Sequence, residues 1–393
     1  MKRVGVAIVG AGLVSDSHAE GYLRHKNAAI VAVCDTNREV AERKAALWKA
    51  DTVYSDYDRM LKDPRVDAVD IMTPPFLHRD MAVKAADAGK HVNCEKPFCN
   101  SVREGRQIVE AAARNKVVLA VDESYLFMAT HMKARELIEA GEIGEPRQIR
   151  HEKGSFVPRE AQALDKRRMM SLRKEPVVWR IDPVKSGGGA YPWVFDHAVH
   201  MFATSRFLML DEPIESVTGV TAVYPAGSGG DVYATGAHRD VPVIAWQFRD
   251  IQKQGLWVRA EKKFHNAYHY RTGFVTTVLG SEGMIEVLGE GGGGLEHDGR
   301  PVHLLVRKEN GDVRPILIDQ EGDRIWKSDV SYYDQAHANE AMHFVDCILH
   351  GTRPRYGGEE GIREIATTLA AIKSAVDGRS VRVSEIGDDF TAY

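Results

Sequence analysis

The sequence predicts an α/β protein in which a doubly wound parallel sheet is followed by an α+β domain with a large open antiparallel sheet. In the first third of the 393 residues, buried-strand runs alternate with helix-compatible stretches, as in a parallel sheet with helices on both faces. Beyond residue 140, strand-like runs follow one another and several alternate apolar and polar residues. We expect one domain over residues 1–122 and another over residues 123–393, with a C-terminal helix able to pack back on the first.

Each expected element has its own apolar pattern and its own end signal. In the first domain we expect strands at 4–9, 28–33, 66–72, 91–94 and 117–121, and helices at 16–24, 39–48, 54–62, 78–88 and 102–115. Gly89 suits the position after a helix, and Pro97 stops a strand because it lacks a backbone donor. In the second domain we expect strands at 147–152, 214–222, 241–248, 255–259, 273–279, 283–287, 302–306 and 315–317.

The composition narrows the possible partners. The chain is 44% hydrophobic with a net charge of −4, which does not favour nucleic acid or an anionic membrane as partner. The N-terminal apolar run at 4–9 is too short for a membrane span and is followed by no signal-peptide cleavage site. The four cysteines form no CxxC pair, which suits a reducing compartment. We therefore expect an unprocessed cytoplasmic protein.

A glycine-rich loop follows the first strand. Its spacing is that of GxGxxG with Ser15 in the third position, and a helix-compatible stretch comes next. Such a loop permits a tight turn and brings the backbone close to a pyrophosphate at the positive end of the helix. The pattern predicts a Rossmann-type dinucleotide site whose loop residues are Gly10, Ala11, Gly12 and Leu13.

An acidic residue, Asp35, stands at the end of the second strand. A carboxylate at this place can accept hydrogen bonds from both ribose hydroxyls of NAD and would repel the 2′-phosphate of NADP. Arg38 follows closely and could soften that repulsion. We predict NAD as the cofactor, with NADP as the less favoured alternative.

The third strand ends in Thr73 and Pro74, where the chain should leave the sheet toward the same crevice. His78 opens the helix that follows. It can be a surface residue at a helix start or a residue that contacts the cofactor, and we include all three among the predicted cofactor-binding residues.

The fourth strand ends in Glu95, Lys96 and Pro97, again at the ligand-binding edge of the sheet. A lysine fixed there can donate to a substrate oxygen and favour its anionic form. An ordinary ion pair in a loop is the alternative for an isolated Glu-Lys pair. The glycine loop and Asp35 favour the functional interpretation.

The second domain contains Asp196 and His200, four residues apart and therefore on one face if the stretch is helical. A histidine beside a carboxylate is suited to act as a general base, whereas a polar helix face is the structural alternative. A glycine triplet at 187–189 precedes them and would let the backbone pass close to a ligand. Aromatic and guanidinium side chains that suit sugar binding surround this stretch: Tyr125, Trp179, Arg180, Tyr191 and Trp193.

Together the glycine loop, Asp35, Thr73-Pro74 with His78, and Glu95-Lys96-Pro97 closely resemble the glucose–fructose oxidoreductase/inositol dehydrogenase (Gfo/Idh/MocA) family. The resemblance covers essentially the whole chain. It implies that Lys96 lies beside the nicotinamide and hydrogen-bonds the reacting oxygen, that Glu95 binds the nicotinamide ribose, and that His200 exchanges the proton. It also implies that no metal is required and that the protein forms a homodimer or homotetramer.

The chain departs from the family pattern near the expected substrate. The gap between Gly189 and Asp196 is longer by about one helical turn, and His197-Ala198 replaces the commoner pair between acid and base. We expect an NAD(P)-dependent dehydrogenase acting on a secondary hydroxyl of a sugar, cyclitol or related polyol, with Asp196 orienting His200 or holding a hydroxyl. Two alternatives stay open: a glycosidase or lyase that uses transient oxidation, and a non-enzymatic NAD- or sugar-sensing regulator.

Overall fold

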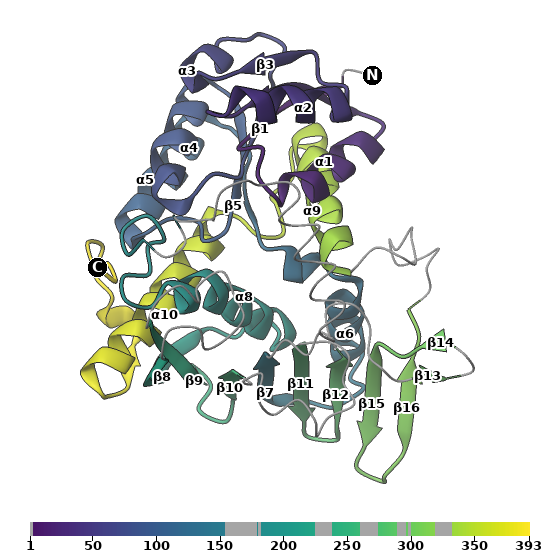
Figure 1. Cartoon of the computed structure of the whole chain (residues 1–393). Helices are drawn as coiled ribbons and strands as arrows, with labels where there is room; N and C mark the ends of the chain where they lie inside the picture. The colour runs from purple at the N-terminus through teal and green to yellow at the C-terminus, as the bar shows by residue number, and fades with distance from the viewer. Residues whose placement is uncertain are drawn as a thin grey trace.

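The computed structural model contains two sheets stacked one above the other, with helices between and around them (Figure 1). The structure describes residues 3–153, 179, 182–224, 238–259, 274–288, 296–297, 300–318 and 332–393. Arg180, one of the residues predicted to bind the substrate, lies outside these residues.

The first sheet confirms the predicted doubly wound architecture. Its strands run parallel in the order β3-β2-β1-β4-β5-β6, so the direction of winding reverses between β1 and β4. Ligands of such sheets bind outside the carboxyl ends of the strands at this reversal. The strands are β1 Val4–Val9, β2 Ala28–Cys34, β3 Thr52–Tyr54, β4 Ala68–Ile71, β5 His91–Glu95 and β6 Leu119–Asp122.

Helices connect these strands, and two of them, α2 and α5, begin at short polar side chains that cap them. Asn37 accepts a hydrogen bond from the backbone of Val40 at the start of α2, and Ser101 accepts one from Glu104 at the start of α5. The helices of this part are α1 Ser15–Arg24, α2 Arg38–Trp48, α3 Tyr57–Met60, η1 Pro75–Leu77, α4 His78–Asp87 and α5 Val102–Asn115.

The second sheet is mixed and largely antiparallel. Its strand order among the described residues is β16-β15-β12-β11-β7-β10-β9-β8-β17, and β7 runs parallel to β10. The strands are β7 Pro146–Lys153, β8 Ile214–Tyr224, β9 His238–Phe248, β10 Gln254–Arg259, β11 Phe274–Gly280, β12 Gly283–Leu288, β15 Leu304–Lys308, β16 Val313–Ile316 and β17 Val381–Arg382. A separate pair comprises β13 Glu296–His297 and β14 Arg300–Pro301.

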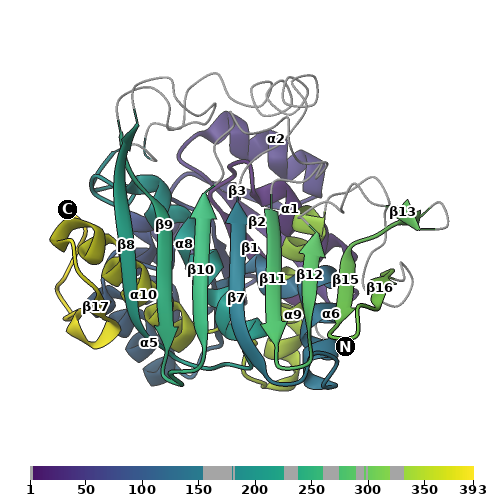
Figure 2. The ribbon, with the colours of Figure 1, turned by 90° about the horizontal axis from the view of Figure 1, so that it is seen from below.

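Helices cover one face of this sheet, whereas no described helix covers the other, which we call the open face (Figure 2). On the covered face, Trp246 and Trp257 are buried in the main core. On the open face, Val220 is 55% exposed and Leu256 and Met284 are half-buried. The remaining helical segments are η2 Ser124–Phe127, α6 Ala129–Glu139, α8 Pro192–Leu208, α9 Tyr332–His350, α10 Gly358–Asp377 and η5 Val383–Glu385.

Helix α9, late in the chain, packs against α1 of the first part (Figure 1). A Cβ at Gly21 would lie 2.4 Å from the carbonyl oxygen of Ala338, so the two backbones approach closely there. Phe344 and Val345 share a buried cluster with residues of β1 and α1. The core around the first sheet therefore includes residues from the C-terminal region. Among the described helices, none is both long enough and apolar enough to cross a bilayer.

Candidate active site

Lys96 and Asp196 form an ion pair that joins the two parts of the chain. Lys96 follows β5, and Asp196 lies in the first turns of α8. The Lys96 Nζ atom donates to Asp196 Oδ1 at 3.0 Å and to the Asp196 backbone carbonyl at 3.1 Å. Each side chain is only 10% exposed, so little water screens the contact. Two residues selected from separate sequence motifs are thus in direct contact.

His200 lies one turn further along α8 and is held by a residue that sequence reasoning missed. Its Nδ1 atom lies 2.6 Å from Oε1 of Glu123, and both side chains are buried. The ring of Tyr125 stacks on the imidazole at 4.2 Å with an interplanar angle of 9°. In the sequence, Glu123 is only the first residue after the predicted domain boundary, and no motif gives it a role. Its side-chain partner is 77 residues away, and no local pattern marks such a contact.

Burial dominates the electrostatics around Glu123. It raises the pKa of the Glu123 carboxyl well above its ordinary value, against the lowering effect of Lys96. Glu340 has a similarly raised pKa, also because of burial, and its Oε1 atom accepts a hydrogen bond from the Glu123 backbone. Because burial disfavours the charged form of Glu123, a protonated His200 beside it would stabilise the ionised carboxylate.

The glycine loop has the geometry that a dinucleotide requires. Gly10 has a φ of +92°, and a Cβ there would lie 2.7 Å from the carbonyl oxygen of Met72. No side chain caps the start of helix α1, which follows this loop. The positive end of the helix dipole therefore faces the loop, where it can attract a phosphate. Asp35 accepts from the backbone of Ala11 at 2.7 Å and from that of Asn37 at 2.8 Å. These features fit the pyrophosphate and the adenosine ribose of NAD.

The other predicted cofactor-binding residues differ in burial and in their partners. Leu13 is half-buried in the loop, whereas Arg38 is 69% exposed on its side chain and paired with Glu42 at 2.8 Å. Glu95 is buried at the end of β5, and this burial raises the pKa of its carboxyl while Lys96 opposes the shift. A contact of each with NAD stays a prediction.

His78 is fully buried, so the surface interpretation of this residue is wrong. Its Nε2 atom lies 2.7 Å from the carbonyl oxygen of Thr73, and its Nδ1 atom lies 3.0 Å from that of Pro97. The imidazole therefore links the loop after β4, which includes Pro74, to the loop after β5. Burial lowers the pKa of His78.

The glycine triplet before α8 is packed against protein atoms. A Cβ at Gly187 would lie 2.4 Å from Oδ1 of Asn100, and one at Gly189 would lie 1.9 Å from the carbonyl oxygen of Ala392. The φ values of +79° and +57° at these two positions also favour glycine. Close packing inside the protein thus accounts for these glycines, where the sequence suggested close approach to a ligand.

The aromatic residues predicted to bind sugar lie mainly in the core. Trp193 is buried between the rings of His197 and Trp257, with centroid distances of 4.6 and 5.1 Å. Tyr191 is also buried and its hydroxyl lies 3.2 Å from that of Thr221. Trp179 is half-buried at an isolated described position. Packing explains the placement of Trp193 and Tyr191, and contact of any of these aromatic residues with a substrate stays a prediction.

Comparison with known proteins assigns both parts of the chain to one group of enzymes. Residues 4–123 match the description "Oxidoreductase family, NAD-binding Rossmann fold", and residues 135–383 match "Oxidoreductase family, C-terminal alpha/beta domain". The chain is 26% identical to the inositol 2-dehydrogenase of Rhizobium meliloti, covering 97% of this chain and 99% of that protein. It is 28% identical to the 2,7-anhydro-N-acetylneuraminate hydratase of Mediterraneibacter gnavus, covering 98% of each.

A solved structure shares the fold across nearly the whole chain. The levoglucosan dehydrogenase complex with NADH and levoglucosan superposes with a TM-score of 0.75 at 21% identity, covering 97% of this chain and all of that one. At this identity the likeness concerns the fold. The two family matches, which together span most of the chain, also establish that the protein is an oxidoreductase.

Proposed function

Because the chain belongs to the Gfo/Idh/MocA oxidoreductase family, we propose that it is an NAD-dependent dehydrogenase or reductase acting on a secondary hydroxyl of a sugar or cyclitol. The observation that carries this proposal is the contact between Lys96 and Asp196, with His200 one turn away on the same helix. Inositol and levoglucosan are the compounds named for the two dehydrogenases compared above.

Lys96, His200 and Asp196 would each have a separate role at the substrate hydroxyl. NAD, held by the glycine loop and Asp35, supplies the oxidant when bound. Lys96 would donate to the reacting oxygen and stabilise negative charge on it, and His200 would accept the hydroxyl proton at Nε2 while Nδ1 faces Glu123. Asp196 holds the Lys96 ammonium in place.

Replacement of Lys96 by Ala tests the assignment. We expect kcat of sugar or cyclitol oxidation to fall at least about 100-fold, the loss that follows removal of one preorganised donor to a developing oxyanion. NAD affinity, measured by fluorescence quenching, should change far less. Turnover close to that of the wild type in the Lys96→Ala protein would refute the proposed role.

A second candidate function is a glycosidase or lyase reaction that uses transient oxidation by NAD without net redox, and the presence of a hydratase among the relatives favours it. In such a reaction Lys96 and His200 would act on a substrate that is oxidised at one carbon. A neighbouring C–H then becomes acidic, a leaving group departs, and the carbon is reduced again by the same NADH. Product formation without accumulation of NADH would favour this reaction. Stoichiometric NADH from a panel of polyols would favour net oxidation.

The open face of the second sheet supports a proposal about assembly. Its exposed Val220 and half-buried Leu256 and Met284 would be covered if two copies associated face to face. We expect light scattering to give the mass of a dimer or tetramer, and we expect Leu256→Glu to weaken this assembly. An unchanged mass in that variant would refute the proposed face.

The four cysteines are buried and free, which supports the cytoplasmic location that we propose.

A further inference from the structure

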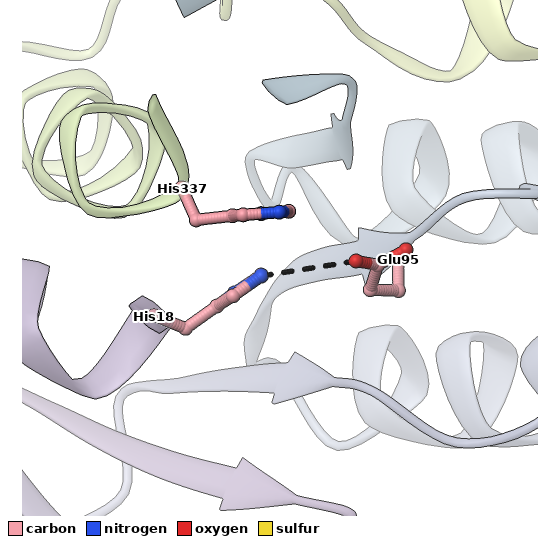
Figure 3. A group of neighbouring side chains, drawn as sticks. All are labelled: His18, Glu95 and His337. Atoms are coloured by element: carbon pink, nitrogen blue, oxygen red, sulfur yellow. Dashed lines mark ion pairs between the residues drawn. The ribbon is translucent and has the colours of Figure 1, made fainter. Parts of the chain in front are cut away.

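Three side chains from distant parts of the sequence converge beside the proposed coenzyme crevice (Figure 3). His18 comes from α1, Glu95 from the end of β5, and His337 from α9. We propose that these residues bind a divalent first-row transition-metal ion such as Zn²⁺. This inference goes beyond the proposed function, which requires no metal.

The distances suit a site of three protein ligands. One ligand atom from each residue lies within 4.8 Å of those of the other two, and His18 Nε2 lies 3.9 Å from Glu95 Oε1. Ligands about 2.0–2.2 Å from a tetrahedral zinc lie roughly 3.4 Å apart, so a contraction of about half an ångström would bring this pair to bonding geometry. Two histidines and one carboxylate are a ligand set found in zinc and non-haem iron sites.

The His18 ring is oriented toward the proposed ion by its other nitrogen. His18 Nδ1 lies 2.9 Å from Asp70 Oδ2, and that carboxylate also accepts from Tyr22 at 2.8 Å and from Asn93 at 3.2 Å. A carboxylate behind a metal-binding histidine fixes its tautomer and makes its free nitrogen a better ligand. His18 Nε2 is buried, makes no hydrogen bond within the described residues, and points toward Glu95 (Figure 3).

Burial separates this group from an ordinary surface cluster. His18 is 0%, His337 1% and Glu95 7% exposed, so water does not compensate their polar atoms as it does at a surface. A neighbouring carboxylate, Asp122, lies 3.6 Å from His18 Nδ1. A protonated His18 between these carboxylates would also balance their charge, without a metal. The two explanations differ in whether the protein binds one metal ion per chain.

Cobalt binding to the full-length protein distinguishes them. Protein treated with EDTA and freed of NAD is titrated with Co²⁺, whose visible absorption reports a site of low coordination number, and the bound metal is counted by mass spectrometry. We expect one Co²⁺ per chain, displaced by Zn²⁺. Absence of saturable binding, or weak binding without the visible band, would identify an adventitious ion only and overturn the proposal.

Variants locate the site and guard against misfolding. His337→Ala should abolish the visible band, whereas His151→Ala, which changes a buried histidine held by Thr276 and Ser205, should leave it unchanged. Asp70→Asn keeps all three ligands and should weaken Co²⁺ binding about 10- to 100-fold, the usual cost of losing such a supporting carboxylate. Equal affinities in wild type and His337→Ala would refute the site. Because the readout is spectroscopic, the result does not depend on dehydrogenase activity.

Discussion

Replacement of Glu123 by Gln should slow the reaction while it preserves the shape of the site. The Glu123–His200 contact is 2.6 Å long and both side chains are almost fully buried, so no water can take the place of the carboxylate that would face a protonated His200. A buried hydrogen bond to a charged group contributes about 1.5–3 kcal/mol, which corresponds to roughly a 10- to 150-fold loss of rate if it acts when His200 is protonated. We therefore expect kcat to fall by that factor with little change in KM.

The assay is steady-state NADH formation with a polyol substrate, combined with a double-mutant cycle. Glu340→Gln is the matched control, because Glu340 is an equally buried carboxyl that touches the Glu123 backbone and is not paired with His200 in the contacts described above. We expect it to change kcat less than about threefold, well below the loss that a hydrogen bond to a charged group would cause. In a His200→Ala background, Glu123→Gln should have almost no further effect, since the residues act as a unit. Fully additive losses would refute the reasoning.

Three further predictions concern the surroundings of the site. Gly189→Ala places a Cβ against the Ala392 carbonyl at a φ of +57°, so urea unfolding should show a larger loss of stability than for Gly378→Ala, where the φ is +67° and nothing lies within 4 Å; equal losses would contradict this. Burial lowers the pKa of His78, so below about pH 6.5 the unfolded chain binds a proton that the folded protein resists. As the pH falls, the free energy of unfolding should therefore decrease more steeply for the wild type than for His78→Gln. Equal dependence of the two proteins on pH would contradict the effect. Asp35→Ser removes a carboxylate that would repel a 2′-phosphate, so the ratio of kcat/KM for NADP over NAD should rise, whereas a constant ratio would assign cofactor choice elsewhere.

The sequence predicted the elements of the first part well because their signals are local. The strand expected at 91–94 is β5 His91–Glu95, and the helix expected at 102–115 is α5 Val102–Asn115. The stretch 54–62 was expected to be one short helix, and instead β3 Thr52–Tyr54 precedes α3 Tyr57–Met60. A three-residue strand has too few positions to show a periodic pattern, and its pairing with β2 supplies what the local sequence lacks.

The sequence predicted the residues of the candidate site one by one and expected Asp196 to orient His200 or hold a hydroxyl, but it did not predict the contacts of Asp196 with Lys96 and of His200 with Glu123. Lys96, Asp196 and His200 were each found from a motif, whereas the ion pair of Lys96 with Asp196 joins positions 100 residues apart. Glu123 has no motif, because its role depends on the tertiary position of α8. The pairing of His200 with Glu123 therefore had to come from the structure.

The packing of α9 on α1 has a consequence for how the protein is made. A ribosome releases the residues of the first sheet long before it releases α9, Tyr332–His350, whose side chains complete the cluster around Phe344. Until then, the face of α1 at Gly21 stays without the surface that covers it in the mature protein. Although a chain usually folds its N-terminal domain during synthesis, the nucleotide-binding part of this protein can finish its core only after most of the second part has been made.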